Sequence, residues 1–241
     1  MTSKKLVHLQ AGLPENLIVK VSPRAKRMAL RLDPQSRVMN LVVPKRARLE
    51  NAYLFANEHK QWIYDRLAEL PDPVPFEDGE KLPVFGMKRQ IEVDYDPDLR
   101  KTDIELYSNE LYVSTNKEDP SNRIKRFLKE EAKNHMTEMV HEKAAEIGGD
   151  VQSVTIRDTK SRWGSCSEDG KISLSWRLIF APYEAMDYVV AHEVAHLVHM
   201  DHGDRFWDLC ADLSEDFSTG VMWMKEHGHE LMRYGVSEDA F

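Results

Sequence analysis

The sequence predicts an α+β fold in which a smaller β-rich lobe with one helix precedes a mostly helical lobe. Three observations support this fold class. Short apolar runs alternate with turn residues before residue 118, a long amphipathic segment follows, and an apolar helix-like run near residue 190 contains several histidines. We therefore expect an amino-terminal lobe over residues 1–118 and a carboxy-terminal lobe over residues 119–241.

The amino-terminal lobe is expected to contain strands on both sides of its helix. Residues 17–44 form short apolar runs split by Pro, Asp and Ser, which predicts two or three antiparallel strands. Apolar residues at helical spacing predict a helix over about 49–69, and the prolines of "PDPVPFEDGEKLP" indicate a linker or exposed loop. Strict alternation around the "DPD" and "SN" turns then predicts a small β-meander over about 88–115.

The carboxy-terminal lobe is predicted to contain a long helix, a β-hairpin and two further helices. The long helix runs from about Ser121 to Ile147. The segments "VTIRD" and "KISLSW" are expected to be the strands of the hairpin, joined through a glycine-containing turn. Pro182 opens the next helix, Gly203 breaks it, and Asp204 is the predicted N-cap of the last one.

The composition indicates a soluble globular protein with enough apolar residues for a sizeable core. Of its 241 residues, 41% are hydrophobic and 31% are charged. No apolar run is long enough to span a membrane, and the start lacks the apolar segment of a secretory signal, so we expect a cytoplasmic protein without membrane contact. Cys166 and Cys210 are too few for a disulfide framework, and we expect both thiols to be reduced.

The net charge of −8 conceals an asymmetry along the chain. Residues 1–70 carry a net charge of +7, and the remaining residues carry −15. The segments "SPRAKRMALRL" and "VPKRAR" make the amino-terminal lobe locally basic, which is compatible with a polyanionic partner. A solvated strand face explains the same pattern, since no basic motif interleaved with aromatic residues supports nucleic-acid binding.

The segment "VVAHEVAHLVHMDHGDRFW" carries the most specific functional signal. Its "HEVAH" motif places His192 and His196 about one helical turn apart and about 40° apart around the helix, so both imidazoles can bind one Zn²⁺. Glu193 projects beside such a metal and is therefore the predicted general base for a zinc-activated water. The apolar flanks indicate a buried helix, which seldom retains such polar groups unless they are paired or bind a metal.

The spacing of residues leaves the third metal ligand open. His199 shares the helix face, but its Cα lies about 10.5 Å from that of His192 along the axis, which is a long span for one ion. Glu215 or Asp216 on the following helix would provide a carboxylate ligand. His202 follows His196 by six residues, where "DHG" allows the chain to bend back, and spacing favours it without excluding the others.

Longer motifs resemble those of a known family. The segments "RWGSCS", "ISLSWRLIFAP" and "DYVVAHEVAHLVHMDHGDRFW" closely resemble the YgjP-like family of bacterial metal-dependent hydrolases, a zincin-type group similar to the SprT-like proteases. The resemblance extends from about Leu17 to Tyr234 and implies a zincin-like metallopeptidase lobe, with an active-site helix plus a β-hairpin and one Zn²⁺ per chain. It assigns the zinc ligands to His192, His196 and His202 and the catalytic acid/base to Glu193.

The "SRWGSCS" segment permits two interpretations. In the functional one, the edge of the following hairpin pairs with an extended peptide, and Arg162 or a backbone N–H near Gly164 and Ser165 stabilises the oxyanion. In the structural one, Trp163 packs in the core and Gly164 permits a bend beneath the active-site helix. We also expect Phe206 and Trp207 to pack the last helix onto the helix before it.

These observations predict a zinc metallopeptidase that acts on a protein or peptide substrate. Two other functions remain possible on the sequence: a nucleic-acid- or ribosome-associated binding module with a largely structural zinc site, and a zinc hydrolase of small amides. Glu193 argues against the binding module, because a structural metal site has no use for a base at that position.

Overall fold

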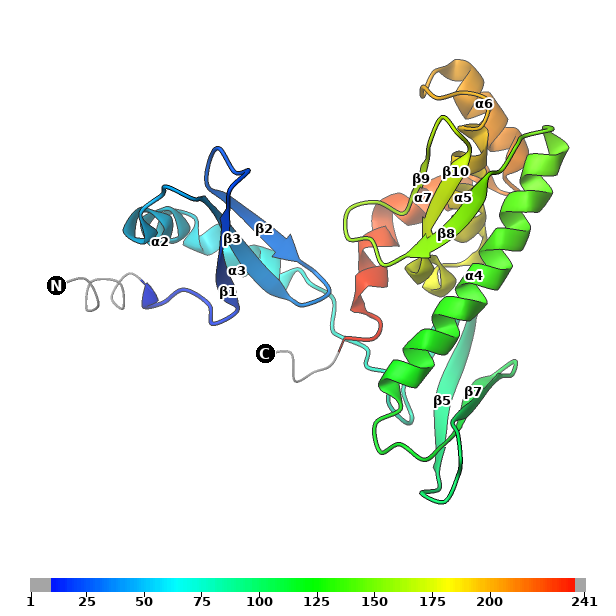
Figure 1. The fold of residues 1–241 in the computed structure, drawn as a ribbon, viewed down its shortest axis with the longest axis horizontal. Coiled ribbons are helices and arrows are strands. Elements are labelled where there is room, and N and C mark those ends of the chain that lie inside the picture. Colours follow the sequence, from blue (N-terminus) through cyan, green and yellow to red (C-terminus); the bar gives the residue numbers. More distant parts are fainter. Residues whose placement is uncertain (1–9, 237–241) are drawn as a thin grey trace. The chain divides into compact units, whose positions relative to one another are not determined.

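The computed structural model describes residues 10–236 and confirms the α+β class (Figure 1). The chain forms two compact units. The amino-terminal unit extends to Pro73 and also includes Val236, and the carboxy-terminal unit covers Val74–Gly235. The predicted boundary at residue 118 therefore lies inside the carboxy-terminal unit. In the described part of the chain, no helix is both long and apolar enough to cross a membrane.

The amino-terminal unit is built on a three-stranded sheet and two helices. Its strands are β1 (Leu17–Ser22), β2 (Ala29–Asp33) and β3 (Val38–Pro44), and its helices are α2 (Leu49–Glu58) and α3 (Lys60–Ala68). The strand order is β1-β3-β2, and β1 pairs in parallel with β3, which departs from the predicted antiparallel set. The central β3 supplies the buried Met39, Leu41 and Val43. The predicted single helix is interrupted at His59, whose backbone leaves the helical region.

A four-stranded sheet opens the carboxy-terminal unit. Its strands are β4 (Lys81–Val84), β5 (Met87–Tyr95), β6 (Asp103–Leu106) and β7 (Glu110–Thr115). Their order is β4-β5-β7-β6, with β5 and β7 parallel, so the predicted meander is wrong in its pairing. The buried Leu111 and Val113 place β7 inside the sheet, while the half-exposed β6 lies at the edge.

The packing of the long helix α4 (Ser121–Glu146) explains why the boundary between the two units precedes the four-stranded sheet. Its buried Ile124 and Leu128 belong to the same hydrophobic cluster as Ile91 and Leu111 of the four-stranded sheet. The sheet therefore contributes to the core of the carboxy-terminal unit. The bounds of α4 agree with the predicted helix to within one residue at its carboxyl end.

A second three-stranded sheet lies beside α4 (Figure 1). Its strands are β8 (Ser153–Arg157), β9 (Gly164–Cys166) and β10 (Lys171–Ser175), in the order β8-β10-β9. The predicted hairpin joined "VTIRD" to "KISLSW", but β8 pairs in parallel with β10, and the hairpin partner of β10 is β9. Gly170, with φ +73°, makes the turn between β9 and β10.

Three α-helices follow the second three-stranded sheet. The short 3₁₀ helix η1 (Trp176–Phe180) precedes them, and the 3₁₀ helix η2 (Gly228–Arg233) follows them. They are α5 (Tyr183–Ala195), α6 (Asp204–Leu213) and α7 (Phe217–His227). The N-cap of α6 is Gly203, and the predicted cap Asp204 is instead its first residue, where its charge faces the positive end of the helix dipole. The last helix, α7, was not predicted, although Asp216 caps it by accepting a hydrogen bond from the Thr219 N–H.

A buried ion pair holds α5 in place. Asp187 of α5 is fully buried, and its carboxylate pairs with the Lys143 ammonium of α4 at 2.5 Å. The same ammonium donates to the carbonyl of Leu213 at the end of α6. Because removing one partner of a buried ion pair is costly, this interaction determines how α4, α5 and α6 meet.

Candidate metal centre

Helix α5 is the element on which the centre is built. Its apolar residues pack against α4, α6, α7 and β9 and are buried: Val189, Val190, Ala191, Val194 and Ala195. His192, Glu193 and His196 share this helix with them, and α5 ends at Ala195, with His196 as its C-cap. The chain then turns through residues 197–203 before α6 begins. This turn returns His202 to the two histidines of the motif.

Three histidines converge at this point. One ring nitrogen from each of His192, His196 and His202 lies within 4.8 Å of the others. Among residues 10–236, no other cluster of three or more His, Cys, Asp or Glu side chains is close enough to hold a metal ion. The Nε2 atoms of His192 and His202 are 3.2 Å apart. Two nitrogen lone pairs at this distance repel each other unless a proton or a cation lies between them.

The other candidates for the third ligand have different contacts. The backbone carbonyl of His199 is 3.0 Å from Nδ1 of His196, so this residue orients a neighbouring ring through its main chain. Such a contact fixes the tautomer and leaves the other nitrogen of His196 free for a metal. Glu215 accepts a hydrogen bond from the Tyr183 hydroxyl, and Asp216 caps α7.

The protonation states of His192 and His196 are compatible with metal binding. Burial lowers the pKa of His192 to about 4, and the charges of His196 and His202 act in the same direction. Burial also lowers the pKa of His196, although its contact with the His199 carbonyl opposes the shift. Neutral imidazole is the form that binds a metal. The three converging rings therefore fit a metal ion that prefers nitrogen ligands.

Aromatic side chains of α6 pack around the histidines. Phe206 is fully buried, and its ring centroid lies 4.9, 4.5 and 4.7 Å from those of His192, His196 and His202. Trp207 is partly exposed and also contacts His192 and His202. These contacts confirm that Phe206 packs α6 onto α5, and they restrict the orientation of all three imidazoles.

Glu193 is a buried carboxyl group beside the histidine cluster. Its exposed fraction is 5%, and its Oε2 has no hydrogen-bond partner among the described residues. Burial raises the pKa of Glu193 to about 8, while the positive charge of Arg162 opposes this rise. A buried carboxyl group with a pKa near neutrality can both accept and release a proton, which is a property of a general acid/base.

Strand β9 lies directly against Glu193. A Cβ atom added to Gly164 would lie 2.2 Å from Oε1 of Glu193 and 2.5 Å from its Cγ. No side chain fits between the strand and the carboxylate, so only glycine permits this approach. The bend that the sequence predicted at Gly164 is therefore a close contact with the candidate base.

Residues of β9 alternate between those whose backbone groups bond to β10 and those whose backbone groups face away from it. The Ser175 N–H donates to the Trp163 carbonyl, and the Ser167 N–H donates to the Lys171 carbonyl. Because hydrogen-bonded pairs alternate along an antiparallel ladder, Ser165 also bonds to β10, whereas the N–H and C=O groups of Gly164 point away from it. Since β9 is the edge strand, the main chain of Gly164 is turned to the free edge of the sheet, beside Glu193.

A cavity of about 380 Å³ adjoins the centre. His192, Glu193 and Gly164 line it, together with Trp163 and Tyr188. Helix α7 forms another part of the cavity wall with Val221, Met224 and Lys225, which the sequence analysis did not predict. The signal was present, because Phe217, Val221 and Met224 follow the capping residue Asp216 at helical spacing.

Both cysteines are free thiols. Burial raises the pKa of Cys166 to about 11, with a further rise from the charges of Glu193 and Asp169. The pKa of the buried Cys210 is raised to about 12, and burial is again the largest cause. Both groups are therefore protonated at neutral pH and are poor nucleophiles.

The fold and the site fit the class of metal-dependent hydrolases: this is an α+β protein in which three histidines converge and a buried carboxyl group lies on the helix that carries two of them. The family model described as "YgjP-like, metallopeptidase domain" matches residues 26–227. The chain belongs to the YgjP-like metallopeptidase family, which implies a metal-dependent hydrolase. Neither the curated proteins nor the solved structures gave a significant match.

Proposed function

We propose that this protein is a zinc-dependent peptidase with His192, His196 and His202 as metal ligands and Glu193 as general base. One observation carries the proposal: one ring nitrogen from each of the three histidines lies within 4.8 Å of the others, while the buried carboxyl group of Glu193 lies beside them on α5. Catalytic zinc sites typically use three protein ligands and leave one position open. The packing of β9 against α5 supports the proposal of a zincin-like lobe.

The proposed mechanism assigns proton transfer to Glu193. A zinc ion bound by the histidines would supply a Lewis acid for the scissile carbonyl and make a water molecule more acidic. Glu193 in its ionised form accepts a proton from the attacking water and then delivers it to the departing amine. Arg162 favours the ionised form of Glu193 through its charge. The edge-facing N–H of Gly164 is the candidate oxyanion donor in this strand, because that of Ser165 is used by β10.

An extended peptide is the substrate class that the free edge of β9 favours. The N–H and C=O groups of Gly164 and Cys166 point to this edge and can pair with an added strand. The adjoining cavity, with Trp163, Tyr188 and Met224 in its wall, has room for one apolar side chain of that strand. Small amides would leave the unpaired edge groups unused.

Metal analysis combined with peptide cleavage tests the proposal. We expect purified protein to contain about one zinc ion per chain and to cleave members of a random peptide library, with activity abolished by chelation and restored by zinc. A panel of small amides serves as the comparison. Zinc-loaded protein that leaves the library intact but hydrolyses the amides would contradict the peptidase assignment.

The basic segments of the amino-terminal unit support a separate proposal, binding of a polyanion. Six basic side chains lie in the segments that follow β1 and β3, and all are exposed or partly exposed: Arg24, Lys26, Arg27, Lys45, Arg46 and Arg48. Accessible Lys and Arg side chains clustered in this way can neutralise phosphates. The proposal is independent of the chemistry at the histidine centre.

A further inference from the structure

The outer face of the β8-β10-β9 sheet contains a polar cavity that plays no part in the proposed mechanism. Its volume is about 380 Å³. The opposite face of the sheet carries the buried Ile172 and Leu174, so the alternation of side chains turns the hydroxyls of Thr155, Ser165 and Ser173 outward. Neither an aromatic ring nor a carboxylate lines the cavity. A hydroxyl-lined surface without carboxylates is suited to an anion.

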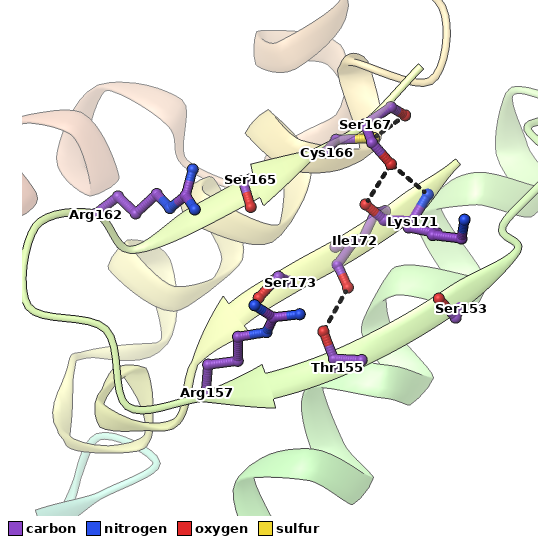
Figure 2. A pocket seen from close by; sticks show the side chains of 10 residues that line it. All are labelled: Ser153, Thr155, Arg157, Arg162, Ser165, Cys166, Ser167, Lys171, Ile172 and Ser173. Atoms are coloured by element: carbon purple, nitrogen blue, oxygen red, sulfur yellow. Dashed lines mark hydrogen bonds between the residues drawn. The ribbon is translucent and has the colours of Figure 1, made fainter. Parts of the chain in front are cut away.

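Two arginines lie at this cavity without a carboxylate at ion-pair distance, although the charge of Arg162 also acts on Glu193. Figure 2 shows Arg157 of β8 extending toward Ser173, and Arg162, just before β9, extending toward Ser165. Within the described residues, neither guanidinium makes a hydrogen bond or a close ion pair. By contrast, Lys171 at the same cavity is paired with Asp169, and Arg177 elsewhere in the unit is paired with Asp158. The two guanidinium groups therefore remain available for an external anion.

The position of the cavity relates it to the candidate active site. Residues of β9 alternate between the two faces of the sheet, so Ser165 lines the polar cavity while Gly164 touches Glu193 on the other face. A peptide strand added to the edge of β9 would alternate in the same way. Every second side chain of such a peptide would point to the outer face, beside Arg162 and Ser165.

We propose that this cavity binds an acidic side chain of the peptide substrate, with Arg157 and Arg162 as the recognising groups. The inference rests on the proposed function, because it takes the substrate to be an extended peptide at β9. A carboxylate matches the planar fork of a guanidinium and accepts additional hydrogen bonds from hydroxyls. Nucleic acid fits less well, because base stacking requires an aromatic platform that the cavity lacks.

Direct binding to zinc-loaded, full-length protein tests the inference. The probes are two fluorescein-labelled octapeptides, (Ala-Glu)₄ and (Ala-Gln)₄, in which alternate positions place all Glu or all Gln side chains on one face of a strand. The Glu193→Gln background prevents turnover during anisotropy measurements. We expect the Glu peptide to bind at least about tenfold more tightly than the Gln peptide, because only a carboxylate forms charge-assisted hydrogen bonds with both arginines.

The variants Arg157→Gln and Arg162→Gln should each remove most of this preference, and Arg100→Gln, an exposed arginine away from the cavity, should retain it. Equal binding of the two peptides, or an undiminished preference in both arginine variants, would overturn the inference. Tight, arginine-dependent binding of inorganic pyrophosphate with no binding of the Glu peptide would overturn it in favour of a phosphate ligand.

Peptide cleavage by the wild-type protein separates this inference from the proposed function. Cleavage of the random library without a preference for acidic residues refutes the inference alone. No cleavage by zinc-loaded wild-type protein refutes the peptidase proposal, whatever the binding data show. Arginine-dependent selection of acidic peptides in both cleavage and binding supports both.

Discussion

At the residue scale, the contact between Gly164 and Glu193 is the feature on which the candidate chemistry depends most closely. The carboxyl group is buried, lacks a hydrogen-bond partner for one oxygen among the described residues and lies where any Cβ on residue 164 would be. A residue without a side chain therefore determines where the candidate base can stand.

Gly164→Ala should bind zinc normally but turn over far more slowly. The added methyl group cannot occupy the space of the Glu193 carboxylate, so this side chain must move away from its position beside the histidines. General-base catalysis typically contributes about a hundredfold or more to rate, and we expect kcat to fall by at least that factor. Glu193→Gln is the matched reference, and steady-state kinetics with zinc analysis provides the measurement. An Ala variant with wild-type kcat would refute the positioning role of Gly164.

The identity of the third ligand leads to a second prediction at this scale. His202→Ala should release zinc readily, because it removes one of three converging nitrogens. His199→Ala and Glu215→Ala should retain zinc, since His199 acts through its backbone carbonyl and Glu215 bonds to Tyr183. Zinc occupancy of the three purified variants decides among them. Zinc release confined to the Glu215 variant would show that the ligand set is wrong.

At the scale of elements, the end of β8 is held by a buried arginine of the following 3₁₀ helix. Arg177 is 1% exposed, and its Nε donates to the Asp158 carboxylate at 2.9 Å. Its Nη1 donates to the backbone carbonyls of Leu231 and Tyr234. This side chain therefore connects the second sheet to the carboxyl-terminal segment and supports the parallel position of β8 beside β10.

Asp158→Asn should destabilise the protein at neutral pH and much less in acid. Burial tends to raise the pKa of Asp158, but the charge and hydrogen bond of Arg177 outweigh it, so the pKa is lowered in the folded state. Stability from such a group is present above its unfolded pKa and declines as the pH falls through its folded pKa. We expect the free energy of unfolding to fall by about 2 kcal/mol at pH 7, because a buried arginine is left without its charged partner.

Urea unfolding of the wild type and the variant at pH 7 and pH 3 measures this effect. The control is Asp103→Asn, which removes an exposed carboxylate paired with Lys101 at 3.8 Å and should cost little at either pH. A difference between wild type and Asp158→Asn that is as large at pH 3 as at pH 7 would contradict the electrostatic explanation.

At the scale of the whole molecule, the two units carry different charges and, in our proposals, different roles. The amino-terminal residues 1–70 have a net charge of +7, and the histidine centre belongs to the carboxy-terminal unit. Each unit has its own hydrophobic cluster. Substitutions on the accessible basic segments should therefore leave the core around α5 intact.

Neutralising the six basic side chains together should weaken retention by nucleic acid at low ionic strength. The change is Arg24, Lys26, Arg27, Lys45, Arg46 and Arg48 to Gln. The slope of log affinity against log salt concentration should fall by about one unit for each phosphate that the variant no longer neutralises. Peptide cleavage should persist, because these residues lie outside the unit that contains the histidines. Wild-type protein without salt-sensitive retention would show that the basic face is a solvated surface.

What the sequence determined by itself is local. The 3.6-residue period predicted α4 almost to its ends, and "HEVAH" placed His192 and His196 on one helix face, since helical geometry alone relates residues four apart. The α+β class and the family resemblance follow from the same kind of pattern. These features depend on neighbours in the chain, which a sequence displays directly.

Only the tertiary structure decided the remainder, because it depends on contacts between distant segments. Spacing could not choose among His202, His199 and Glu215, and the turn between α5 and α6 brings His202 to the cluster. The parallel pairing of β8 with β10 and the place of β4–β7 in the carboxy-terminal unit result from shared burial. The approach of Gly164 to Glu193 joins strand and helix across the core, and neither its position nor its consequence can be read from local periodicity.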